Sequence, residues 1–206
     1  MELKAQDGDI YYTIEKIETA EIKIKGSKFI GTAAHTPTKE SAMEFLTLMR
    51  SQFFDATHNC YAYKIGWNGM EYRFSDDGEP NGTGGKPILF SLSKFDVNDL
   101  IVVVTRYFGG TKLGVGPLAR AYGDSACAVL EKCNKVVVHR TKKVKINCLY
   151  EDINTVKRLL SQFAVSVNED YHESIEIIAD IHISQAQIFC DELSRITNAR
   201  VGAMVL

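Results

Sequence analysis

The sequence predicts an α+β protein, and two observations support this fold class. The first is a continuous run of apolar, mostly β-branched residues from Leu100 to Val104, which is typical of a central strand covered on both faces. The second is the part of the chain after Asn134, where strand and helix patterns follow in the order βαββαβ of a ferredoxin-like domain. We therefore expect two domains, residues 1–134 and residues 135–206.

Charge and hydrophobicity are those of an ordinary globular protein. The chain has 206 residues, of which 45% are hydrophobic and 24% are charged, enough to bury the core of one large or two small domains. The net charge is -2, with 15 basic and 17 acidic residues up to Asn134 and 9 of each after it. Binding to nucleic acid would therefore depend on a local group of basic residues, because neither half of the chain is basic as a whole.

We expect a cytoplasmic protein that is not anchored in a membrane. No apolar run approaches the roughly 18 residues of a membrane span. The segment from Met1 to Asp7 lacks the basic start and apolar middle of a signal peptide. The cysteines are Cys60, Cys127, Cys133, Cys148 and Cys190. They form no CxxC pair, which indicates reduced thiols and not a disulfide framework.

The periodicity of apolar residues assigns the elements in order. In the first domain we expect strands over residues 10–17, 20–35, 56–66, 71–75 and 100–104, and helices over residues 38–53, 87–95 and 115–134. In the second domain we expect strands over residues 136–149, 165–170, 174–182 and 200–205, and helices over residues 152–162 and 185–196. Thr38 is a suitable cap for the first helix, and Gly26-Ser27 suggests a β-bulge in the second strand.

His58 and Cys60 share one face of the strand over residues 56–66, a pattern that raises the question of a metal site. A closed zinc site needs about four ligands, and no second pair of ligands is evident. We interpret His58 as a packed or hydrogen-bonded side chain and predict no metal.

Two glycine-rich segments form the candidate functional site. The first, from Ser75 to Pro87, has no hydrophobic periodicity, and its glycines permit positive φ angles. Because Pro87 suits the first turn of a helix, we expect the amides after Thr83 to be free to meet an anion. The second segment, from Arg106 to Gly114, joins the central strand to a helix and could also present amides to an anion. The spacing does not fit a Walker A loop.

These segments strongly resemble the Impact/YigZ family. The resemblance is carried by Phe74–Pro80, Gly82–Leu89 and Val103–Gly114, and it extends through His58–Tyr63 and Arg120–Tyr122 over nearly the whole chain. It implies the two-domain layout of bacterial members. It also implies an N-terminal domain like the second domain of ribosomal protein five of the small subunit and like domain four of elongation factor G.

The resemblance further implies a regulatory binding function linked to translation, since eukaryotic relatives restrain a starvation-activated kinase pathway by occupying its ribosome-associated activator. We expect no catalytic residue and no cofactor, and we expect the partner to be the ribosome, RNA or a translation-regulatory protein. The sequence does not indicate an oligomeric state. The predicted binding residues are Arg73, Asp76, Asp77, Glu79, Thr83, Gly84, Gly85, Lys86, Arg106, Tyr107, Phe108, Gly109, Gly110, Lys112, Gly114 and Arg120.

Two alternatives to this interpretation stay open. The charged residues could hold RNA phosphates, with Tyr107 or Phe108 stacking on bases, or they could tie the loops together, for instance through Arg106 and Asp76 or Asp77. The chain could also be a phosphate- or nucleotide-dependent enzyme, because galactokinase-like small-metabolite kinases are similar in pairing these two folds. Asp76 or Asp77 would then hold magnesium, although the serine-rich half of the kinase loop is absent.

Overall fold

The computed structural model describes residues 6–206, which form two compact units. One unit comprises Tyr11–Val137, and the other comprises Val138–Leu206 together with the described residues up to Ile10. The prediction that Met1 to Asp7 is no signal peptide falls mostly outside the described residues. The domain division after Asn134 stays a prediction.

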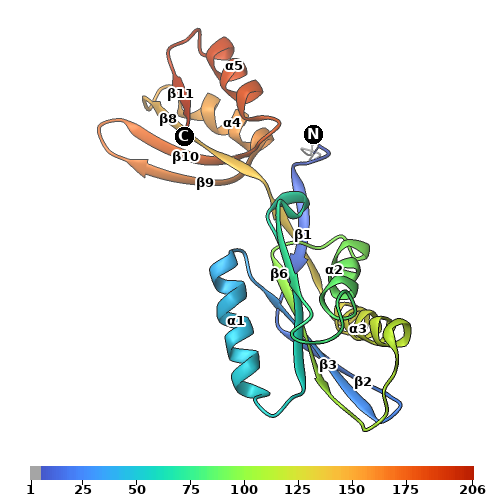
Figure 1. Cartoon of the computed structure of the whole chain (residues 1–206). Coiled ribbons are helices and arrows are strands. Elements are labelled where there is room, and N and C mark those ends of the chain that lie inside the picture. Colours follow the sequence, from blue (N-terminus) through green and yellow to red (C-terminus); the bar gives the residue numbers. More distant parts are fainter. Residues whose placement is uncertain (1–5) are drawn as a thin grey trace. The chain divides into compact units, whose positions relative to one another are not determined.

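The first unit is built on a five-stranded antiparallel sheet in the order β2-β3-β6-β4-β5 (Figure 1). Its strands are β2 (Glu18–Ile24), β3 (Ser27–His35), β4 (His58–Ile65), β5 (Glu71–Ser75) and β6 (Leu100–Tyr107). β6 lies in the middle of the sheet, and the residues from Leu100 to Val104 are fully buried. The continuous apolar run therefore predicted the central strand correctly.

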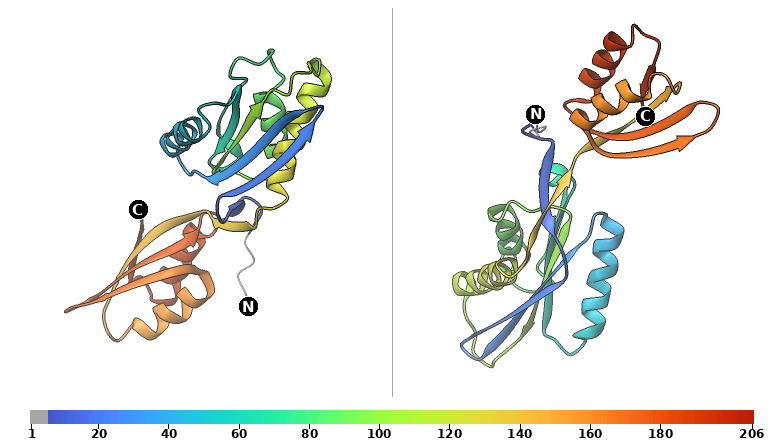
Figure 2. Two further views of the ribbon diagram at one scale, coloured as in Figure 1. Left: turned by 90° about the horizontal axis from the view of Figure 1, so that it is seen from below. Right: turned by 180° about the vertical axis from the view of Figure 1, so that it is seen from behind.

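Helices cover both faces of this sheet (Figures 1 and 2). Helix α1 (Lys39–Gln52) packs on one face, where Leu46 and Met49 meet Tyr63 of β4. Helices α2 (Gly85–Lys94) and α3 (Val115–Leu130) pack on the other. Thr38 caps α1 as predicted, since its hydroxyl accepts a hydrogen bond of 3.1 Å from the Ser41 amide.

Two long predicted strands are each divided in the structure. The segment over residues 20–35 turns back at Lys25 and Gly26, whose φ angles are 47° and 81°, so the predicted bulge is wrong and a tight hairpin turn stands in its place. Gly26 was the signal for this turn, but we interpreted it as a bulge because lysine at the preceding position rarely adopts positive φ. The segment over residues 136–149 is divided at Arg140 into β7 (Lys135–His139) and β8 (Thr141–Cys148). β7 pairs with β1 (Ile10–Ile14) in a separate two-stranded sheet.

The second unit has the predicted βαββαβ order. Its elements after β8 are α4 (Ile153–Phe163), β9 (Ala164–Tyr171), β10 (Ile175–His182), α5 (Ala186–Ile196) and β11 (Gly202–Val205). The sheet has the order β11-β8-β10-β9, and one core joins it to both helices through residues such as Leu160, Ile177 and Phe189. The α+β class is thus confirmed, while the likeness of the first unit to ribosomal protein five and elongation factor G stays a prediction. Among the described helices, none combines the length and hydropathy needed to cross a membrane.

Candidate binding site

The first glycine-rich segment folds around the carboxylate of Asp76. The Asp76 side chain accepts hydrogen bonds from the amides of Gly82, Gly84 and Gly85 at 2.8, 2.8 and 2.9 Å. The Thr83 amide donates to the Pro80 carbonyl at 3.0 Å. The prediction that these amides are free to meet an anion is therefore wrong, because the chain supplies its own anion to the N-terminus of α2.

Asp77 connects this closed segment to the neighbouring elements. Its carboxylate accepts from the Asn59 amide at 2.7 Å and forms an ion pair of 2.6 Å with Arg50 of α1. The His58 Nδ1 atom donates a hydrogen bond of 2.7 Å to the Asp77 carbonyl. His58 is hydrogen-bonded, as predicted, and its ring orientation is fixed by the loop.

Glu79 and Arg106 form a buried ion pair between the two glycine-rich segments. Arg106 Nη1 donates to Glu79 Oε1 at 2.6 Å, and the two side chains are only 6% and 4% exposed. The Tyr122 hydroxyl of α3 donates to the same oxygen at 2.7 Å. Arg106 thus pairs with Glu79, not with Asp76 or Asp77 as we had suggested. Its Nε atom is buried and has no hydrogen-bond partner among the described residues.

The Cys60 thiol and the Tyr122 phenol near this ion pair are held in their neutral forms. Burial raises the pKa of the Cys60 thiol to about 12, with the nearby carboxylates of Glu79, Asp77 and Asp76 adding to the effect. Burial also raises the pKa of the Tyr122 phenol. The Cys60 thiol donates to the Asp76 carbonyl at 2.9 Å, which indicates a structural role for Cys60 and not a metal ligand.

Hydrogen bonds hold the start of the second glycine-rich segment in place, whereas the amides after it have no partner among the described residues. The Gly109 amide donates to the Ser27 hydroxyl at 3.1 Å, and the Phe108 amide donates to the Thr57 hydroxyl at 3.0 Å. From Gly110 to Gly116, no amide donates a hydrogen bond to any residue that the structure describes. This segment is therefore the open one of the two.

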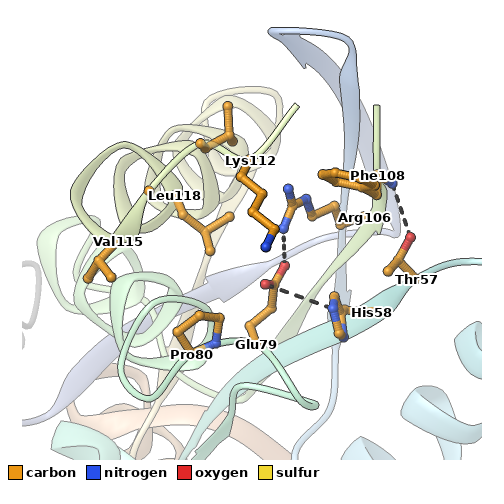
Figure 3. A pocket seen from close by; sticks show the side chains of 11 residues that line it. Thr57, His58, Glu79, Pro80, Arg106, Phe108, Lys112, Val115 and Leu118 are labelled. Carbon is orange, nitrogen blue, oxygen red and sulfur yellow. Dashed lines mark hydrogen bonds and ion pairs between the residues drawn. The ribbon is translucent and has the colours of Figure 1, made fainter. Parts of the chain in front are cut away.

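A pocket of about 410 Å³ lies between the open segment and the buried ion pair (Figure 3). Its polar lining comes from Thr57, His58, Glu79, Arg106 and Lys112. Its apolar lining comes from Pro80, Phe108, Leu113, Val115 and Leu118. Figure 3 shows the Glu79 carboxylate between the Arg106 guanidinium and the His58 ring. We call this cavity the Glu79 pocket.

The predicted binding residues fall into several places. Glu79, Arg106, Phe108, Lys112 and Gly114 line the Glu79 pocket, and Gly109 and Gly110 belong to the open segment beside it. Asp76, Asp77, Thr83, Gly84 and Gly85 belong to the closed segment.

Four predicted residues lie apart from the Glu79 pocket. Lys86 and Arg120 line a different groove of about 460 Å³ between α2 and α3. Arg73 pairs in register with Tyr63, whose side chain packs on the α1 face of the sheet, so Arg73 points to the opposite face from Arg106. The Tyr107 hydroxyl donates to Asp55 at 2.7 Å.

The sequence analysis missed His58 as part of the site. The family resemblance ran through His58–Tyr63, but the register that places His58 opposite Arg106 is not readable from either segment. Tyr122 and Thr57 were missed for the same reason: each joins the site through tertiary contacts. Within residues 6–206, no group of three or more His, Cys, Asp or Glu side chains is placed to hold a metal ion.

Fold and site together define a two-unit α+β protein whose first unit presents a ligand-sized pocket beside an open glycine loop. The family model described as the Impact N-terminal domain matches residues 25–130. The chain is 36% identical to the IMPACT family member YvyE of Bacillus subtilis, over 92% of this chain and 88% of that protein. It is also 36% identical to the IMPACT family member YigZ of Escherichia coli, over 72% of this chain and 74% of that protein. The chain belongs to the Impact family.

A solved structure shares the whole fold. This crystal structure of a protein described as hypothetical matches 96% of this chain and 98% of its own, with a TM-score of 0.69 and 28% sequence identity. The fold is therefore common to both chains.

Proposed function

We propose that the protein is a non-enzymatic regulatory binding protein linked to translation, and that it binds single-stranded RNA at the open glycine segment. The observation that carries this proposal is the contrast between the two segments. Asp76 occupies the amides of the first, whereas the amides from Gly110 to Gly116 have no partner among the described residues. Consecutive free amides at a helix N-terminus suit a phosphate group.

The side chains beside these amides fit the same ligand. Lys112 is exposed and forms no ion pair among the described residues, so its charge is available to a phosphate. Phe108 is 46% exposed, and the Arg106 guanidinium carbon lies 5.5 Å from its ring centroid, which holds the ring in place. Exposed aromatic rings beside basic groups bind single strands by stacking on bases.

The link to translation in this proposal comes from membership in the Impact family and from what the resemblance to that family implies. A cytoplasmic location, expected from the sequence, is part of the same proposal. RNA is favoured over a protein partner because free amides, a free lysine and an exposed ring together match a nucleotide chain.

The alternative of a phosphate- or nucleotide-dependent enzyme has no comparable support. It would use Asp76 or Asp77 to hold magnesium. Asp76 already accepts three amide hydrogen bonds, and Asp77 is paired with Arg50 and the Asn59 amide. Both carboxylates are therefore used within the fold.

The test is fluorescence polarisation with a labelled single-stranded RNA of about eight nucleotides, between about 50 and 200 mM salt. We expect Phe108→Ala to weaken binding by about 1–3 kcal/mol through the loss of stacking. Lys112→Ala should weaken binding and reduce the slope of log affinity against log salt by about 0.7, as expected for one lost phosphate contact.

Lys39→Ala is the matched control, because Lys39 is exposed and unpaired among the described residues and lies on α1, which covers the opposite face of the sheet. If the wild-type chain binds no RNA, or if Lys112→Ala and Phe108→Ala bind as well as Lys39→Ala, the proposal is wrong. A protein partner at this surface would then be the better interpretation.

A further inference from the structure

We propose that the Glu79 pocket takes one unstacked base of the bound RNA and selects bases with an exocyclic amino group against uracil. His58 and Glu79 are the specificity-determining residues. This inference rests on the proposed function, since it assigns the base that the RNA-binding surface reads.

The first step concerns the tautomer of His58. A carbonyl oxygen only accepts hydrogen bonds, so the contact of 2.7 Å between His58 Nδ1 and the Asp77 carbonyl requires the proton to be on Nδ1. In the neutral ring, Nε2 is then an acceptor without a proton. With the ring neutral, the closed segment thus presents a hydrogen-bond acceptor to the pocket that His58 lines; a protonated ring would instead form an ion pair with Glu79 Oε2.

The second step concerns the free oxygen of Glu79. Oε1 accepts from both Arg106 and Tyr122, whereas Oε2 has no hydrogen-bond donor among the described residues. His58 Nε2 lies 3.8 Å from Oε2, which is too long for a hydrogen bond. The Glu79 side chain is only 4% exposed. Glu79 and His58 both line the pocket, so Oε2 and Nε2 can accept hydrogen bonds from one donor group of a ligand.

The third step concerns the shape and lining of the pocket. Its volume of about 410 Å³ falls in the range of small-molecule sites. Pro80, Leu113 and Leu118 give it apolar walls, and Phe108 lies at the same pocket. Apolar walls with a few polar groups are typical of sites that take up an extruded base and read its Watson–Crick edge.

The two acceptors and the apolar walls together indicate which class of base fits the pocket. An exocyclic amino group carries two hydrogens on one nitrogen and can donate to both Glu79 Oε2 and His58 Nε2. Glutamate accepting from the cytosine amino group is an established mode of base recognition. Uracil carries a carbonyl oxygen at the corresponding position, so three acceptors would face one another. Such a repulsive contact gives specificity against the wrong base.

Cytosine and uracil oligonucleotides of equal length provide the test, since the two bases differ in the amino group but not in ring size. We expect the full chain to bind oligo(C) roughly tenfold more tightly than oligo(U) in fluorescence polarisation. His58→Leu should reduce this ratio to about one or two, because one acceptor is lost. Circular dichroism would confirm that the variant is folded.

Two further variants separate this inference from the proposed function. Lys112→Ala should weaken the binding of both oligonucleotides, because a phosphate contact carries no sequence information. Val115→Trp narrows the pocket from a side chain that is 65% exposed, so it should fold normally and lose the preference for oligo(C). If the wild-type chain binds oligo(C) and oligo(U) equally, or if His58→Leu keeps the full ratio, the inference is wrong although RNA binding stands. If no RNA binds, the proposed function fails as well.

Discussion

Gly109 lies directly against the backbone of Gly26. A Cβ atom built on Gly109 would stand 1.9 Å from the Gly26 carbonyl carbon and 2.2 Å from its oxygen. The tip of the β2–β3 hairpin and the start of the open segment are thus in backbone contact, which only glycine permits. This contact fixes the point from which Phe108 and Lys112 extend toward the Glu79 pocket.

Gly109→Ala should therefore push the open segment away from the hairpin. We expect a loss of about 1–3 kcal/mol in the free energy of unfolding, as for an overpacked site, together with weaker RNA binding. Urea denaturation and fluorescence polarisation measure the two effects. Gly116→Ala is the control, because its Cβ would meet nothing within 4 Å and alanine favours the helix. Equal stability of the two variants would contradict this prediction.

Removing one partner of the buried ion pair should lower the free energy of unfolding more than removing both partners. Arg106→Leu leaves the Glu79 carboxylate buried without its cation, and we expect a loss of about 3–5 kcal/mol in the free energy of unfolding. The double variant with Glu79→Leu should recover much of that loss, because no charge is then left uncompensated. Urea denaturation of both variants provides the measurement.

Arg50 offers a control of matched geometry. Its ion pair with Asp77 has the same length of 2.6 Å, but the side chains are 46% and 26% exposed. Solvent screens such a pair, so Arg50→Leu should cost only about 0–1 kcal/mol. A loss for Arg106→Leu as small as that for Arg50→Leu would show that burial of the Glu79 pair has no energetic consequence.

Asp76 should be required for the shape of the closed segment. Asp76→Ala removes the acceptor of three amides, of which those of the buried Gly84 and Gly85 would each cost about 1–3 kcal/mol if left unsatisfied. We expect a total loss of at least about 2 kcal/mol in the free energy of unfolding. Hydrogen exchange should also become faster at Gly82, Gly84 and Gly85. Asp124→Ala, an exposed change on α3, is the control; unchanged exchange in Asp76→Ala would refute the prediction.

The sequence predicted the elements whose burial pattern is simple. The run from Leu100 to Val104 indicates a central strand because both of its faces are apolar. The helices of the second unit are indicated by apolar residues that recur at the helical period. The turn at Lys25 and the break at Arg140 carry no such pattern. Each depends on contacts with segments far away in the chain.

The partners of the charged residues were beyond what the sequence could show. Three acids lie close together at Asp76, Asp77 and Glu79, and no local rule decides which of them meets Arg106. The positive φ angles of Asp77 and Gly78, 47° and 89°, turn the chain between these acids. Asp76 accordingly faces the amides of its own loop, while Glu79 enters the pocket beside β6. The backbone of this loop thus determines whether a carboxylate accepts hydrogen bonds from the amides of the first segment or lines the Glu79 pocket.

The buried thiol of Cys60 should make stability depend on pH in the alkaline range. Burial raises its pKa from 9.0 to about 12, so between these values the folded chain holds a proton that the unfolded chain releases. The free energy of unfolding then falls as the pH rises, by up to about 1.4 kcal/mol per pH unit for one group. The contribution of Cys60 is fully present below pH 9.0 and is lost as the pH approaches 12.

Cys60→Ala should therefore lower stability at neutral pH through the lost packing but show a shallower fall above pH 9.0. Some of the fall should remain, because burial also raises the pKa of Cys133 to about 11 and the pKa of Tyr122 in the same direction. Urea denaturation between about pH 7.5 and pH 10.5 measures the slope. Parallel curves for Cys60→Ala and the wild-type chain would mean that the Cys60 thiol ionises as readily in the folded chain as in the unfolded one.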